Sequence, residues 1–246
     1  MDHHTVAAVS IAGSCLDVLG SLYLAYDLLG GQHGPLRVLT RAVTYAIVFG
    51  LGYGLGLGLI FGVAAGAANG ITVAIELNRA ARNQPHYPLF WESVFSVIRG
   101  FAFAVGMYWL AGFRFAAAFG VIITLGQISA YLRGVRPSID YGRSGPRLTR
   151  RQWHGSLVRS LGAVGTALLC SLLVQHVAHP WLLALRIGLV IGIVTATGLM
   201  VSPFIEHFAD TLPSRLMGAF GIGLIFIGFT LQSLQYWLVV LDVPVK

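Results

Sequence analysis

Asp17 is the residue with the clearest chemical potential, because it is a carboxylate inside an apolar run. Ser10, Ser14, Asp17 and Ser21 follow one another at intervals of four, three and four residues. This spacing places them on one face of a helix. Such a stripe can carry a proton, an ion or a polar solute. It can equally be a hydrogen-bonded seam between helices with Asp17 protonated or paired, and both interpretations remain open.

Arg99 and Gln127 are two further polar residues that we expect inside apolar runs. Arg99 lies about 10 Å inside a run that begins near residue 92, at a rise of about 1.5 Å per residue. We predict that it pairs with Asp17 across two helices. Gln127 can join neighbouring helices by hydrogen bonds or line a path for a polar solute. The candidate polar pathway is therefore Asp17, Ser10, Ser14, Ser21, Arg99 and Gln127.

Motifs for common catalytic chemistries are missing from the sequence. It contains no G-x-x-x-x-G-K-[ST] phosphate-binding loop, no H-E-x-x-H zinc motif and no G-x-S-x-G nucleophile motif. We therefore assign no catalytic, cofactor-binding or metal-binding residues and expect no cofactor. These absences favour a protein that is not an enzyme.

Composition indicates which elements must position these residues. Of the 246 residues, 56% are hydrophobic and 10% are charged, whereas about 25% are charged in a soluble domain. We predict an all-α polytopic integral membrane protein with about eight transmembrane helices, forming a single transmembrane helical domain over residues 1–246. The predicted spans lie near residues 5–29, 41–57, 59–78, 92–112, 113–132, 155–175, 181–201 and 216–240.

Glycines recur at every fourth position within a stretch, residues 42–75, that has no charged residue. Small residues at this spacing let two helices approach closely in a bilayer. One helix over residues 41–78 would be about 55 Å long, against about 30 Å for the hydrocarbon core. We therefore predict a glycine-rich helical hairpin over 41–78 with its turn near 56–60, and one long helix is the alternative. The helix-packing ladder is Gly50, Gly54, Gly58, Gly62, Gly66 and Gly70.

Basic residues indicate the orientation of the chain in the membrane. With eight spans, most arginines fall in connections on one side, which is the cytoplasmic side by the positive-inside rule. Both termini are then outside (N-out and C-out). The most basic stretch, Arg133 to Arg151, is expected to attract anionic lipid headgroups. The net charge of +7 is thus explained by topology, and we expect no nucleic-acid partner.

Three function classes fit these features. The first is a small transporter or channel for an ion or small polar solute. The second is a non-transporting membrane scaffold or partner subunit, packed through its glycine-rich helices as a homo-oligomer or with a membrane partner. The third is a membrane-embedded lipid-binding protein or enzyme. Arginine is used almost to the exclusion of lysine, with Lys246 the only lysine. This usage is typical of GC-rich bacterial genomes and favours a multi-pass protein of the plasma membrane, the bacterial inner membrane.

Overall fold

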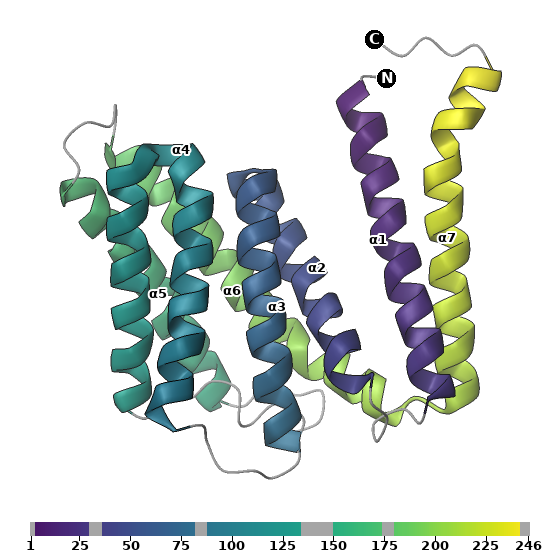
Figure 1. The fold of residues 1–246 in the computed structure, drawn as a ribbon, viewed down its shortest axis with the longest axis horizontal. Helices are drawn as coiled ribbons and strands as arrows, with labels where there is room; N and C mark the ends of the chain where they lie inside the picture. The colour runs from purple at the N-terminus through teal and green to yellow at the C-terminus, as the bar shows by residue number, and fades with distance from the viewer. Residues whose placement is uncertain (1–2, 30–35, 82–87, 134–149, 174–179, 242–246) are drawn as a thin grey trace. The chain divides into compact units, whose positions relative to one another are not determined.

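A computed structural model describes residues 3–29, 36–81, 88–133, 150–173 and 180–241 (Figure 1). All regular structure in these ranges is α-helical. The seven helices are α1 (His3–Leu28), α2 (Arg37–Leu57), α3 (Leu59–Ala81), α4 (Leu89–Leu132), α5 (Arg150–Leu173), α6 (Pro180–Thr211) and α7 (Ser214–Val240).

The chain forms two compact units. One consists of Met1–Thr40 together with Phe208–Lys246, and the other of Arg41–His207. We call them the terminal unit and the central unit and describe each by itself. In the terminal unit α1 and α7 pack against each other along their length (Figure 1). That residues 1–246 form a single domain stays a prediction.

The helices have the length and composition of membrane spans. Six of those in the described ranges are long and apolar enough to cross a membrane, and α5 adds a shorter apolar stretch at Leu161–Leu172. One of the six, α4, has 44 residues and breaks at Gly112. The break in α4 divides the seven helices into eight helical segments, each of which overlaps one of the predicted spans. The chain is an all-α, multi-pass membrane protein.

The glycine-rich stretch is a hairpin, as the sequence predicts. Helix α2 ends at Leu57 and α3 begins at Leu59. Between them Gly58 has a φ of +100°, a conformation that is strained for residues with a side chain. A Cβ built on Gly62 would lie 2.7 Å from the Gly54 Cα, and one built on Gly66 would lie 2.6 Å from the Gly50 Cα. Residues equally distant from Gly58 therefore face each other, with the two backbones in contact.

Helix α4 also contains a glycine turn between two close-packed halves. Gly112 has φ 80° and ψ 173°, and it separates a first half, Leu89 to Ala111, from a second half, Phe113 to Leu132. A Cβ built on Gly100 in the first half would lie 2.7 Å from the carbonyl oxygen of Gly120 in the second. The two halves of α4 are thus a second close-packed hairpin within the central unit.

Aromatic residues fill the core of the central unit. Tyr53 of α2 contacts Phe61 of α3 and Phe103 of α4 edge to face, with ring centroids 5.6 and 5.7 Å apart. Phe103 also stacks on Phe119 at 6.4 Å. The hydroxyl of Tyr53 lies 3.1 Å from the Thr195 hydroxyl of α6. Because Tyr53 has apolar and polar partners on three other helices, it fixes their mutual packing.

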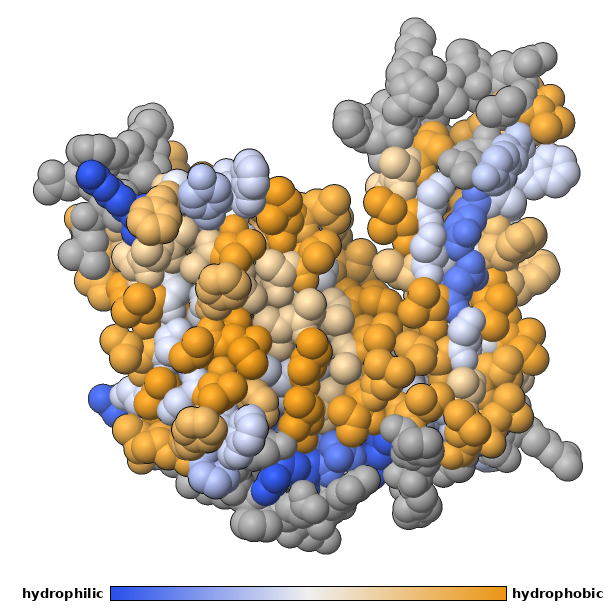
Figure 2. Space-filling view, viewed as in Figure 1, coloured by the Kyte–Doolittle hydropathy of each residue, from blue (hydrophilic) through white to orange (hydrophobic). Residues whose placement is uncertain are grey.

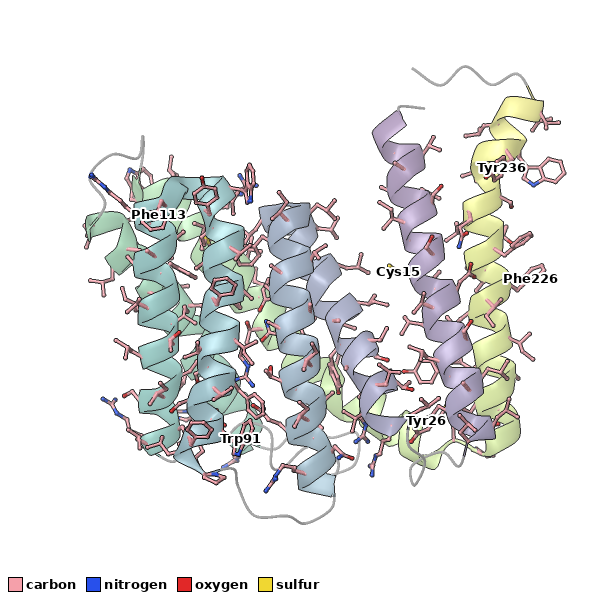
Figure 3. The ribbon with its side chains drawn as sticks, in the orientation of Figure 1. Cys15, Tyr26, Trp91, Phe113, Phe226 and Tyr236 are labelled. Carbon is pink, nitrogen blue, oxygen red and sulfur yellow. The ribbon has the colours of Figure 1, made fainter. Side chains whose placement is uncertain are left out.

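The outer surface suits a lipid environment. Apolar side chains cover most of the helices in the view of Figure 2, and many large ones are exposed. Trp91 lies near the start of the first half of α4, and Phe113 lies at the start of the second half (Figure 3). Aromatic rings favour the headgroup region at helix ends. Among the tryptophan side chains that the structure describes, those within three residues of a helix end or of the Gly112 break are exposed: Trp91, Trp109, Trp181 and Trp237.

Candidate functional site

Asp17 lies midway along α1 and faces α7. Its Oδ2 accepts a hydrogen bond from the side-chain amide of Gln232. Its Oδ1 is enclosed and has no hydrogen-bond partner. This oxygen lies so close to Gly228 of α7 that a Cβ built on that glycine would clash with it. A carboxyl group with one amide partner and one free oxygen is therefore held inside a membrane-spanning helix pair.

The three serines of the predicted stripe are differently placed. Ser14 and Ser21 are exposed, and Ser10 is partly buried. The Ser14 hydroxyl donates to the Ser10 carbonyl at 3.1 Å, a local bond within the helix. The Ser10 hydroxyl is enclosed and has no hydrogen-bond partner. Figure 2 shows that hydrophilic residues form a continuous stripe along the seam between α1 and α7.

Glycines bring α1 and α7 into backbone contact on either side of Asp17. A Cβ on Gly13 would lie 2.6 Å from the Gly228 carbonyl oxygen, and one on Gly20 would lie 2.5 Å from that of Gly221. All four glycines are buried. Their spacing of seven residues keeps them on one side of each helix. Asp17 thus lies between two places where the helices have no room for side chains.

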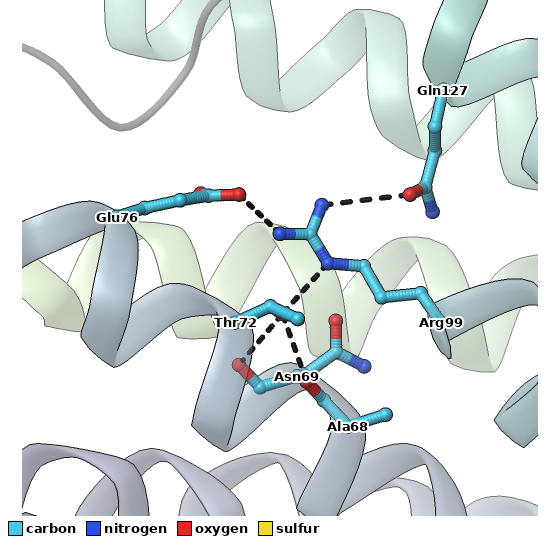
Figure 4. A network of polar contacts seen from close by, with 6 residues as sticks. All are labelled: Ala68, Asn69, Thr72, Glu76, Arg99 and Gln127. Carbon is cyan, nitrogen blue, oxygen red and sulfur yellow. Dashed lines mark hydrogen bonds and ion pairs between the residues drawn. The ribbon is translucent and has the colours of Figure 1, made fainter. Parts of the chain in front are cut away.

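A second polar cluster lies in the central unit, around Arg99 of α4 (Figure 4). The Arg99 Nε donates to the Thr72 hydroxyl of α3 at 2.8 Å. Its Nη2 forms an ion pair with Glu76 of α3, and its Nη1 contacts the Gln127 oxygen at 3.5 Å. Each nitrogen of the guanidinium therefore has a partner, drawn from α3 and from the second half of α4.

The cluster is buried and supported by its own helices. Arg99 is 7% exposed, and Thr72 is fully buried. Thr72 in turn donates to the Ala68 carbonyl at 2.8 Å, which fixes its oxygen toward Arg99. A lone arginine inside a bilayer is costly, and Glu76 offsets its charge. The cluster is a closed ion-pair network that joins α3 to both halves of α4.

The structure does not show the predicted pairing of Asp17 with Arg99, which stays a prediction. It gives each residue its own partner within its own unit, Gln232 for Asp17 and Glu76 for Arg99. The charge of Arg99 is thus compensated by a carboxylate on the neighbouring helix. Of the six candidate pathway residues, the structure brings Arg99 and Gln127 together. The other four, Ser10, Ser14, Asp17 and Ser21, all lie on α1.

Glu76, Thr72 and Gln232 are the residues of these clusters that the candidate pathway omits. Asn69, Thr72 and Glu76 follow at intervals of three and four residues on α3, the same one-face spacing that identifies the stripe on α1. That spacing is the sequence signal that points to them. For Gln232, the only signal in the sequence is that a polar residue lies inside an apolar run.

The glycine ladder packs α2 against α3 at all of its positions except one. A Cβ on Gly66 would lie 2.6 Å from the Gly50 Cα. Gly58 has nothing within 4 Å of such a Cβ, so it serves the turn. Gly54 tolerates a Cβ, because its nearest neighbour would be 3.9 Å away. The helical glycines of the ladder that leave no room for a side chain are thus Gly62, Gly66 and Gly70, all on α3.

No family model matches the chain, and no curated protein and no solved structure is significantly similar to it. Within the described ranges, no three His, Cys, Asp or Glu side chains are grouped as metal ligands. Residues 134–149, most of the basic stretch from Arg133 to Arg151, lie outside the described residues. Its contact with anionic lipid stays a prediction, as does the homo-oligomer.

Proposed function

We propose that the protein is a small transporter or channel for an ion or small polar solute, with Asp17 as the ionisable group of its path. The observation that carries this proposal is the Asp17 carboxyl group itself. It lies inside a span, has Gln232 as its side-chain partner, and keeps Oδ1 unpartnered.

Comparison of the two clusters supports this choice. At Arg99 every guanidinium nitrogen has a partner, and an oppositely charged residue compensates the charge. At Asp17 the partner is a neutral amide, and no cation among the described residues contacts the carboxyl group. Ionisable residues inside membrane spans tend to mark ion pathways and proton relays. We assign Arg99 and Gln127 to the support of the fold and Asp17 to the path.

Flux into reconstituted vesicles tests the proposal. The purified protein would be reconstituted into lipid vesicles and assayed for protons, alkali cations, chloride and a panel of small polar solutes. We expect Asp17→Asn to abolish a flux that the wild type shows. Asp27→Asn, at the end of the same helix, is the matched control and should retain it. Equal flux through all three proteins for every solute would overturn the proposal.

A membrane scaffold is the second candidate, and the backbone contacts between helices favour it. Gly62 and Gly66 of α3, and Gly13 and Gly20 of α1, all pack directly against a neighbouring backbone. A protein whose purpose is tight packing would show no solute flux. In that case Asp17→Asn would change only the unfolding temperature in detergent or the oligomeric state.

We further propose that both termini face outward in the plasma membrane of a bacterium. Breaks at Gly58 and Gly112 support this orientation, because they divide two of six apolar runs, α2–α3 and α4, into hairpins, which gives eight segments and leaves both termini on one side. Arg41 and Arg79 then lie at the cytoplasmic ends of α2 and α3, in agreement with the positive-inside rule.

A further inference from the structure

The carboxyl group of Asp17 has a close neighbour at each oxygen. Gln232 contacts Oδ2, and the backbone of Gly228 closes over Oδ1. A Cβ built on Gly228 would clash with Oδ1 and would also lie 2.6 Å from the Gly13 carbonyl oxygen, so the two oxygens border the same small space. Gly13 precedes Asp17 by four residues, which is the spacing at which a side-chain O–H donates to a helix carbonyl. An acceptor for a protonated Oδ1 is therefore at hand.

The seam around this carboxyl group has no room for a solute. Above and below Asp17, the pairs Gly13–Gly228 and Gly20–Gly221 leave no space even for a Cβ between the two backbones. A hydrated cation or an organic solute is far larger than a methyl group. A proton needs no such space, because it moves along oxygen atoms.

Within the described part of the chain, the other titratable side chains of α1 and α7 are not hydrogen-bond partners of this group. In the described part of the pair they are Cys15, Tyr23, Tyr26, Asp27 and Tyr236. Asp27 lies ten residues along α1 from Asp17. Its Oδ2 would lie 3.5 Å from a Cβ built on Gly218 of α7. The side chain that α7 places on Asp17 is the neutral amide of Gln232.

We propose that the ion carried is the proton and that Asp17 binds and releases it at Oδ1. This inference rests on the function proposed above and names its substrate. On binding, an O–H bond forms at Oδ1 as an O–H bond of hydronium breaks and leaves water, and the carboxylate becomes a neutral acid that donates to the Gly13 carbonyl. On release, that bond breaks and the proton returns to water. No other bond changes and no redox partner is needed.

Asp17→Asn imitates the neutral acid, because its amide N–H takes the place of the Oδ1–H and its oxygen still accepts from Gln232. We therefore expect this variant to fold with an unfolding temperature at least equal to that of the wild type, yet to carry no proton. Asp17→Leu fills similar space without either hydrogen bond and should lower the unfolding temperature. Asp27→Asn should behave as the wild type in both respects.

Proton flux in vesicles decides between the outcomes. A pH-sensitive dye inside the vesicles should report flux for the wild type and Asp27→Asn, and background for Asp17→Asn. Sodium, potassium, chloride and neutral solutes should not cross. A flux that depends on Asp17 but carries another ion or a solute, with the internal pH unchanged, would overturn the proton assignment and leave the transport function standing. No flux of any kind that depends on Asp17 would overturn both.

Infrared spectroscopy gives a second reading that is independent of flux. The wild type should show a carboxyl C=O band that shifts in heavy water and appears as the pH is lowered. The band should be absent from Asp17→Asn and present in Asp27→Asn. A band unchanged by Asp17→Asn would show that Asp17 takes up no proton and would overturn the inference.

Discussion

Asp17 and Arg99 are both ionisable side chains inside apolar helices, but they are stabilised in different ways. Arg99 has a carboxylate, a hydroxyl and an amide as partners. Asp17 has one amide and keeps an enclosed oxygen without a partner. A charge inside a bilayer is tolerated when it is paired. This difference in pairing is the reason that we assign Arg99 to the fold and propose Asp17 as the group that binds a proton.

The Arg99–Glu76 pair should show a strong asymmetry on mutation. Breaking a buried ion pair from one side costs about 3–5 kcal/mol. Glu76→Gln should be the more damaging single change, because the guanidinium that remains cannot lose its charge. Arg99→Gln should cost less, since a carboxyl group left alone can take up a proton. Unfolding free energies in detergent micelles measure both changes.

The double variant Arg99→Gln with Glu76→Gln provides the control for this pair. It should cost less than the sum of the single changes, because it leaves no uncompensated charge. Arg186→Gln is a second control, since Arg186 is exposed to the surface and donates to the Gly56 carbonyl at 3.1 Å. If the free-energy cost of the double variant equalled the sum of the two single costs, this result would contradict the ion pair as the basis of stability.

At the scale of the helix, each glycine hairpin has a register that its turn sets. In α2 and α3 the residues equally distant from Gly58 meet, and in α4 those equally distant from Gly112 meet. A glycine in the turn and a glycine in the helix contact meet different structural requirements. The turn needs a positive φ, whereas the contact needs the absence of a Cβ. The two requirements can be separated by substitution.

Within the ladder, Gly62→Ala and Gly54→Ala should have opposite effects. The new Cβ at Gly62 would lie 2.5 Å from a backbone oxygen, so the helices must separate, and we expect a loss of about 1–3 kcal/mol. At Gly54 the nearest atom is 3.9 Å away, so the better helix propensity of Ala should give a gain of up to about 1 kcal/mol. Thermal unfolding in detergent measures both. Equal effects would show that α2 and α3 do not pack through these positions.

Gly112→Ala should destabilise the protein although nothing surrounds the new methyl group. No atom lies within 4 Å of a Cβ at this position, but φ 80° with ψ 173° is accessible almost only to glycine. We expect a cost of about 1–3 kcal/mol. Gly126→Ala is the matched control, because it also has open space but lies in regular helix, and it should be neutral or stabilising. Equal stabilities of the two variants would show that the break at Gly112 carries no strain.

At the scale of the whole molecule, the sequence predicts the spans better than their partners. Apolar length limits each span, and the glycines around position 58 mark the hairpin turn, because both depend on neighbouring residues. Pairing depends on the tertiary fold. Asp17 and Gln232 are 215 positions apart in the chain, and no local pattern joins them. Glu76 has a local signal in the sequence, because its spacing places it on the same helix face as Thr72. Its position near the end of a span is, however, also typical of a charge that flanks a span.

The eight-span topology makes a prediction about sidedness that tests the whole arrangement. Leu59 follows the Gly58 turn and is 66% exposed, whereas Ser138 belongs to the basic stretch. With Cys15 and Cys170 replaced by alanine, a membrane-impermeant maleimide should label Leu59→Cys in intact cells. Ser138→Cys should be labelled only after the cells are opened. Leu59 and the termini then lie on the outer side, because the positive-inside rule keeps the arginine-rich connections inside. Labelling of both positions from the same side would contradict eight spans, and an exchange of the two results would keep eight spans but reverse the orientation.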